Sequence, residues 1–257
     1  MQVSDDADVP SLCDALVAQD QPETGNVPML DVSLIANLPP FEGMEREAMA
    51  KLVSQAKALR FEKDRTIFAA GEDAHSFFLL LDGALRVVRI TPEGEQVIAR
   101  YIAAGELFGI AAAIGRTTYP ANAIAAVDCV VLAWPTSIWG DLVAKHPTFA
   151  SNTYKTVGNR LQEAHDHIVE LATERVEQRV ATAILKLARQ TGKKTEEGIL
   201  ITVPVTRQDI SEMTGTTLHT VSRLMSAWEG EGLVSSGRQR IVVVEGHRLA
   251  MLAAGHK

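Results

Sequence analysis

The segment 149–189 reads FASNTYKTVGNRLQEAHDHIVELATERVEQRVATAILKLAR, and its spacing predicts a long helical stretch between Pro147 and Gly192. Apolar residues in its first half recur at alternating steps of four and three, the spacing of a coiled-coil seam. These residues are Tyr154, Val157, Leu161, Ala164, Ile168 and Leu171. The seam predicts pairing with a second copy of the chain; a helix packed on its own domain is the alternative. The pattern breaks at residues 173–175 and resumes with a new phase at Val176, which indicates a hinge.

The chain is long enough for further domains on both sides of this helix, because 257 residues exceed one typical domain. With 46% hydrophobic and 22% charged residues, its composition is that of an ordinary globular protein. No apolar run approaches the roughly 18 residues that argue for a membrane span. No charged stretch followed by an apolar run opens the chain, as it would in an export signal. We therefore expect a cytoplasmic protein with no membrane partner.

Charge is segregated along the chain. The net charge of -7 divides unevenly, because residues 189–257 hold nine Lys or Arg against seven Asp or Glu, whereas residues 1–188 hold 16 against 25. The acidity of the whole chain therefore does not exclude a nucleic-acid partner for its C-terminal part. Residues 1–31 hold seven acidic residues and no basic one, which predicts a mobile acidic segment without a core of its own.

The region 32–148 has the pattern of a β-rich domain. Helical spacing over residues 44–59 gives way at Phe61 to short apolar runs. Glycines punctuate these runs every ten to twelve residues, at Gly71, Gly83, Gly94, Gly105 and Gly115. Regular turns between apolar strands predict an antiparallel sandwich or small barrel. The strands end near Trp134, and residues 136–145 predict a short helix before the long one.

The region 190–257 has the pattern of a winged helix-turn-helix. Thr206 and Asp209 resemble a capping box that opens a helix, and Gly215 makes a turn. A second helix then begins at residues 216–217, with Val221, Leu224 and Trp228 on one face. Its other face carries Leu218, His219, Ser222, Arg223 and Ser226. Residues 233–244 predict a β-hairpin, the wing.

Two strings resemble a known family. AGEDAHSFFLLLDGALRVVRITPEGEQVIARYIAAGELFG, residues 70–109, is similar to the β-roll effector domain of the CRP/FNR regulators. TRQDISEMTGTTLHTVSRLMSAWEGEGLVSSGRQRIVVV, residues 206–244, is similar to their winged helix. The resemblance, over about residues 34–250, implies an α+β fold: an N-terminal β-roll of the cyclic-nucleotide-binding or cupin-like jelly-roll type, a long dimerisation helix and a C-terminal winged helix-turn-helix. It implies a homodimeric transcription regulator, not an enzyme, with double-stranded DNA and RNA polymerase as partners.

The same resemblance implies roles in DNA binding. FNR-type proteins carry Glu-x-x-Ser-Arg in the second helix, and this chain has His219, Ser222 and Arg223 there. The Ser-Arg pair implies an inverted repeat near TTG...CAA, with Arg223 reading a guanine bidentately and His219 altering the neighbouring base preference. We expect phosphate contacts, which position the protein without reading sequence, from Thr206, Arg207, Thr217, Thr220, Arg238 and Arg240.

The sequence says less about which effector the roll binds. Members of the family that bind cyclic AMP hold it with a glutamate and an Arg-Ser pair, and the matching positions here are Ile110 and Pro120-Ala121. A phosphate would find no guanidinium at those positions, so cyclic AMP is not expected. An iron-sulfur cluster needs four thiolates, and this chain has two cysteines, Cys13 and Cys129.

The string TGTTLHTVSRLMSAWE, residues 214–229, is most similar to the NnrR group within the family, the nitric-oxide-responsive regulators of denitrification. This resemblance implies activation of nitrogen-oxide genes by nitric oxide, with haem as a possible cofactor. The candidate ligands are His165, His167 and His75. Alternatives are a different small apolar ligand, no effector, a module that works only through protein partners, or a cupin-like metalloenzyme. A metalloenzyme of that kind needs a cluster of His and carboxylates on strands, and the roll supplies His75 as its only histidine.

Overall fold

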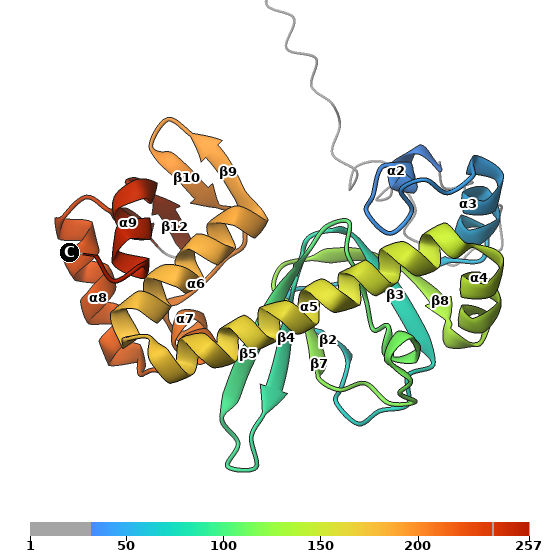
Figure 1. The fold of residues 1–257 in the computed structure, drawn as a ribbon, viewed down its shortest axis with the longest axis horizontal. Coiled ribbons are helices and arrows are strands. Elements are labelled where there is room, and N and C mark those ends of the chain that lie inside the picture. The colour runs from blue at the N-terminus through green and yellow to red at the C-terminus, as the bar shows by residue number, and fades with distance from the viewer. Residues whose placement is uncertain (1–31, 238, 257) are drawn as a thin grey trace, which may run out of the picture.

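The computed structural model describes residues 32–237 and 239–256, so the predicted acidic segment 1–31 lies outside the described residues. The fold is α+β as predicted, with a β-roll, a long helix and a C-terminal helix-turn-helix domain (Figure 1). Two short helices precede the roll, α2 (Ser33–Ala36) and α3 (Arg46–Val53). The predicted helical stretch 44–59 is too long, because Lys57 already begins the first strand. None of the described helices is long and apolar enough to cross a membrane.

The roll consists of two antiparallel four-stranded sheets, ordered β1-β8-β3-β6 and β2-β7-β4-β5. Its strands are β1 (Lys57–Phe61), β2 (Thr66–Phe68), β3 (Ser76–Asp82), β4 (Ala84–Ile90), β5 (Gln96–Ala103), β6 (Leu107–Phe108), β7 (Asn122–Ala125) and β8 (Cys129–Pro135). A short 3-10 helix, η1 (Ala111–Ile114), follows β6. Phe77 stacks on Trp134 at 5.4 Å between ring centres, and the Trp134 indole donates to the Leu52 carbonyl at 2.7 Å. These contacts tie α3 to the roll.

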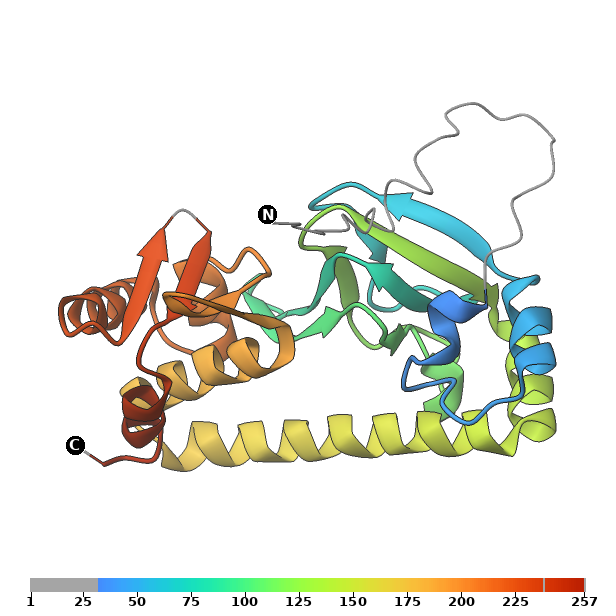
Figure 2. The same cartoon turned by 90° about the horizontal axis from the view of Figure 1, so that it is seen from above.

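The long helix begins where sequence predicts it. After η2 (Thr136–Ile138) and α4 (Trp139–Lys145), helix α5 runs over Pro147–Thr173. Glu174 and Arg175 are extended, with ψ of 148° and 155°, so the predicted hinge is a break in the helix. Helix α6 (Val176–Thr191) then runs back along α5 (Figure 2). The Lys186 ammonium lies 2.6 Å from the Glu170 carboxylate, which joins the two helices beyond the turn.

The C-terminal domain packs on α6. Val180, Ile184 and Leu187 of α6 are fully buried with Val221 and Trp228 in one core. The domain contains a four-stranded sheet ordered β11-β12-β10-β9 and three further helices. These elements are β9 (Gly192–Thr195), β10 (Gly198–Ile201), α7 (Arg207–Thr214), α8 (Leu218–Gly230), β11 (Val234–Gly237), β12 (Arg240–Val243) and α9 (Gly246–Ala253). Sequence reasoning missed β9, β10 and α9, whereas the helix-turn-helix and the wing are as predicted.

Candidate DNA-reading surface and effector cavities

The helix-turn-helix is built by two caps and a glycine. Thr206 Oγ1 accepts from the Asp209 amide at 3.0 Å, and the Asp209 carboxylate accepts from the Thr206 amide at 2.7 Å, a reciprocal capping box. Gly215 ends α7 with φ of 60°, which glycine adopts without steric cost. Thr217 then caps α8 by accepting from the Thr220 amide. The second helix is therefore held at a defined angle to the first.

Helix α8 buries one face and leaves the other open. Val221, Met225 and Trp228 are fully buried against the domain core. His219 and Arg223, one turn apart, are exposed, and Ser222 is half-buried. A helix held from behind with a free guanidinium on its outer face is the geometry that reads bases in a major groove.

The candidate phosphate contacts already have partners within the chain. Arg240 lies 2.8 Å from the Glu197 carboxylate, and Arg207 lies 3.5 Å from Glu229. The other candidates are the caps Thr206 and Thr217 and the Thr220 hydroxyl, which lies 2.9 Å from Thr217 Oγ1. Arg238 lies outside the described residues. A phosphate near Arg207 or Arg240 has to compete with a carboxylate, which reduces the net gain of each contact.

The first helix of the motif packs on the roll. Arg86 of β4 bridges the two parts, with its guanidinium 3.2 Å from Asp209 of α7 and 2.8 Å from Asp64. Tyr101 of β5 is almost fully buried in the shared core, and that burial raises the pKa of its hydroxyl well above the usual value. The carboxylate that caps α7 therefore also connects the roll with the DNA-reading domain.

The predicted seam divides into two groups on α5. Tyr154, Leu161 and Ile168, spaced by seven residues, have 57%, 57% and 62% of their surface exposed, and Leu171 is exposed too. Val157 instead packs partly against the core of its own roll. Leu161 also contributes to the wall of a cavity in the roll, together with Val157 and Ala164. The predicted seam and the lining of that cavity thus share Val157, Leu161 and Ala164.

The roll cavity lies between the sheet β2-β7-β4-β5, η1 and α5 and has a volume of about 470 Å³. Its apolar walls include Phe68, Val87, Ile102, Phe108, Ile114 and Leu161. Ile110, Pro120 and Ala121 line it, as the resemblance placed them, and they bring no charge. The expectation that a ligand would meet no guanidinium holds for those three positions only. Arg100 of β5 and Arg160 of α5 line the same cavity, and they are its only charged residues among the described ones.

Both arginines share one carboxylate. Glu106 Oε2 lies 2.6 Å from Arg100 and 3.4 Å from Arg160. Arg160 also donates to the Leu107 carbonyl, but its buried Nε has no hydrogen-bond partner. Burial and the nearby Arg100 charge lower the pKa of Arg160. Two guanidinium groups thus face a largely apolar space with less than full compensation from Glu106.

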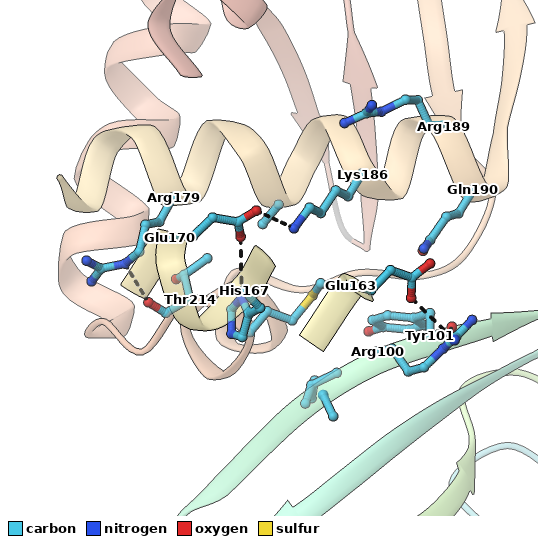
Figure 3. Close-up of a pocket in the computed structure, with 14 residues that line it drawn as sticks. Arg100, Tyr101, Glu163, His167, Glu170, Arg179, Lys186, Arg189, Gln190 and Thr214 are labelled. Atoms are coloured by element: carbon cyan, nitrogen blue, oxygen red, sulfur yellow. Dashed lines mark hydrogen bonds and ion pairs between the residues drawn. The ribbon is translucent and has the colours of Figure 1, made fainter. Parts of the chain in front are cut away.

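A second cavity, of about 270 Å³, lies between β5, α5, α6 and α7 (Figure 3). The inter-domain cavity, as we call it, is lined by Arg100, His167, Glu170, Arg179 and Lys186 among others. His167 lies 3.4 Å from Glu170, which also binds Lys186. Arg179 donates to the Thr214 carbonyl at the end of α7. Arg100 is the residue that lines both this cavity and the roll cavity among the described residues.

The candidate haem ligands lie outside the roll cavity. His165 is exposed and lines neither cavity, and the His75 side chain is 86% exposed beside Asp73. Only His167 lines a cavity, the smaller one. The described residues of the roll cavity include no His, Cys, Met or Tyr, so this space does not fit a haem held by an axial protein ligand. Nor do the described residues contain a cluster of three His, Cys, Asp or Glu that could hold a metal ion.

Sequence reasoning missed Arg100, Glu106 and Arg160, although two of them carry a signal. Arg100 lies two residues before Ile102, one strand period away, where the pattern leads to an inward apolar residue. Arg160 lies three residues after Val157 and four before Ala164, on the face that meets the roll. A charged residue at a position that the pattern assigns to the core is the sign that was available.

Cys129 is not a candidate redox sensor. Its Sγ is buried and lies 3.3 Å from the Ala84 carbonyl and 3.0 Å from that of Val127. Burial raises the pKa of the Cys129 thiol to about 11. The thiol therefore stays protonated at neutral pH and is a poor nucleophile. We expect iodoacetamide to leave Cys129 unmodified in the native protein and to label it in denaturant, as measured by peptide mass spectrometry; rapid native labelling would contradict this.

Comparison with known proteins gives two family matches. Residues 58–146 match the cyclic nucleotide-binding domain, and residues 178–252 match the Crp-like helix-turn-helix domain. The chain is 21% identical over 213 residues to a CRP-like cAMP-activated global transcriptional regulator of Mycobacterium tuberculosis, covering 83% of this chain and 95% of that protein. It is 26% identical over 212 residues to the fumarate and nitrate reduction regulatory protein of Escherichia coli, covering 82% and 83%.

A solved structure agrees with these matches. The structure of FixK2 from Bradyrhizobium japonicum is similar with a TM-score of 0.69 and 26% identity, covering 77% of this chain and 96% of that chain. The similarity therefore extends across the roll, the long helix and the helix-turn-helix domain rather than over one of them.

Proposed function

We propose that this chain, which belongs to the CRP/FNR family of DNA-binding transcription regulators, acts as a pair. Two copies bind an inverted DNA repeat under the control of a ligand in the roll. The observation that carries the proposal is the open face of α8, where Arg223 and His219 are exposed while Trp228 is buried behind them. The exposed stripe Tyr154, Leu161 and Ile168 supports pairing through α5.

The proposed site is an inverted repeat near TTG...CAA. Two α8 helices related by a twofold axis fit major-groove half-sites about 34 Å apart. Arg223 reads a guanine in each half-site, Ser222 supports it, and His219 sets the preference for the adjoining base. RNA polymerase is the proposed partner at the promoter, as the family resemblance implies.

Two signals compete for the gating role. The resemblance to the NnrR group favours nitric oxide and the activation of nitrogen-oxide genes. The second candidate is a different small organic ligand, and the roll cavity favours it, because Phe68 and Phe108 give it apolar walls and its described residues supply no iron ligand. In either case the gate would act through α5, which lines the cavity and carries the stripe.

DNA titration tests the proposal. We expect the full chain to bind a labelled duplex with an inverted TTG repeat more tightly than a scrambled duplex, with affinity falling as salt rises because counterions are released. Fluorescence anisotropy at two salt concentrations measures both effects. Equal affinity for the two duplexes contradicts the proposed function. Parallel anaerobic titrations with a nitric oxide donor, with and without added haem, test the first signal: an unchanged affinity excludes it.

A further inference from the structure

We propose that the roll cavity takes a small apolar acid, whose carboxylate is bound by Arg160 and Arg100 while its hydrocarbon part fills the space between the sheet and α5. The inference deepens the proposed gating by this cavity and rests on it. It names a ligand class that a cavity of about 470 Å³ can enclose, since pockets for small ligands span about 300–1,000 Å³.

The lining of the roll cavity favours a ligand with a hydrocarbon part. Phe68 and Phe108 lie with ring centres 6.1 Å apart, and Ile102 and Ile114 extend the apolar surface. Asn122 is the sole neutral polar residue among the described residues that line the cavity. Burying hydrocarbon there is favourable, whereas a sugar would leave most of its hydroxyl groups without partners.

The two guanidinium groups in the roll cavity favour a ligand that carries a negative charge. Arg100 and Arg160 line the cavity, and Glu106, the carboxylate between them, does not. The Arg160 Nε is buried without a partner, so this guanidinium retains a donor. Glu163, the other carboxylate near Arg100 at 3.4 Å, has half of its side chain exposed. A ligand carboxylate beside Arg160 would be bound by charge-assisted hydrogen bonds, which a neutral group cannot form as strongly.

Matched acids and amides test the inference on the protein without DNA. The probes are phenylacetate, 3-phenylpropanoate and hexanoate, each beside its primary amide, with cyclic AMP as a further probe. Calorimetry and thermal melting at up to millimolar ligand are expected to show binding of at least one acid, with its amide at least tenfold weaker. Cyclic AMP is expected to bind negligibly, because Ile110, Pro120 and Ala121 supply neither a carboxylate nor a further guanidinium.

Variants locate the binding site. Arg160→Gln should weaken the acid at least tenfold, whereas Arg116→Gln, an exposed arginine of the roll that does not line the cavity, should leave its affinity unchanged. Because Arg160→Gln removes buried contacts, Ala121→Leu is the second variant: it fills the cavity, keeps both arginines and should also abolish binding. Circular dichroism and melting check that each variant is folded.

The outcomes separate the inference from the proposed function. No acid binding at millimolar concentration, equal binding of acid and amide, tighter binding of cyclic AMP, or full affinity in folded Arg160→Gln each overturns the inference. A protein that fails in this way yet binds the inverted repeat remains a DNA regulator with another signal. A protein that binds the acid and no DNA overturns the proposed function alone.

Discussion

Ile168→Glu is expected to convert the proposed α5-paired dimer into a monomer at micromolar concentration. Ile168 is 62% exposed on a single chain and lies seven residues from Leu161 in the proposed seam. In a paired helix the two new carboxylates would lie close together without a cation, at a cost on the order of 3–5 kcal/mol. That loss raises the dimer Kd by roughly a hundredfold or more. Sedimentation velocity over a concentration series measures the change.

Val169→Glu is the matched control. Val169 is 58% exposed on the same turn of α5 but falls outside the a and d positions that form a coiled-coil seam. The same substitution there should therefore leave the proposed dimer intact. Ile168 is preferred to Leu161 as the test because Leu161 also lines the roll cavity. A dimer that survives Ile168→Glu, or one that dissociates equally with Val169→Glu, places the interface elsewhere.

Arg223→Ala is expected to remove one bidentate guanine contact from each half-site. The loss is about 1–3 kcal/mol per half-site, and a dimer loses it twice. Affinity for the inverted TTG repeat should fall steeply, while affinity for a scrambled duplex falls only slightly. Because the Arg223 side chain is exposed on α8 while Val221 and Met225 on either side of it are buried, the variant should fold normally. Anisotropy titrations against both duplexes measure the difference.

Two variants serve as controls for Arg223→Ala. Arg240→Ala shows the effect of losing a phosphate contact, and Ser226→Ala shows the effect of changing an exposed residue of α8. Arg240 is expected to contact phosphate, so its loss should weaken both duplexes alike and lower the salt dependence. The effect should be small, because Arg240 lies 2.8 Å from the Glu197 carboxylate in the free protein. On binding DNA it would exchange that carboxylate for a phosphate. Ser226 is exposed further along α8, and its loss should change little. If Arg223→Ala weakens both duplexes equally, Arg223 contacts phosphate and α8 does not read the groove as proposed.

Local patterns were sufficient to predict much of this fold. The heptad spacing and the phase change at residues 173–175 predicted α5, the break and α6, because helix periodicity is set by neighbours in sequence. The capping box at Thr206 and the turn at Gly215 are equally local, and both are present. The hairpin β9-β10 was missed because its lysines and glutamates read as a loop, while Ile201 and the pairing with β12 decide it.

The cavities could not be predicted in the same way. Arg100, Glu106 and Arg160 lie on a strand, a turn and a helix and meet only when the roll closes on α5. The resemblance to the cyclic-AMP-binding members directs attention only to the positions where those proteins hold their ligand. Here these positions are Ile110, Pro120 and Ala121, which carry no charge. Lys186 and Glu170 likewise meet only after α6 has turned back along α5.

The position of Arg100 in the wall of both cavities has a reciprocal consequence. If the roll cavity binds an anion as proposed, that anion would compete with Glu163 for the Arg100 guanidinium, which also lines the inter-domain cavity beside Arg179 and Lys186. A ligand that shifts this boundary changes DNA affinity by some factor, and thermodynamic linkage then requires DNA to change the ligand affinity by the same factor. On the proposed function, the DNA site would thus act as an effector of the roll cavity. A protein seated on its promoter would respond to a different concentration of its signal than one free in solution.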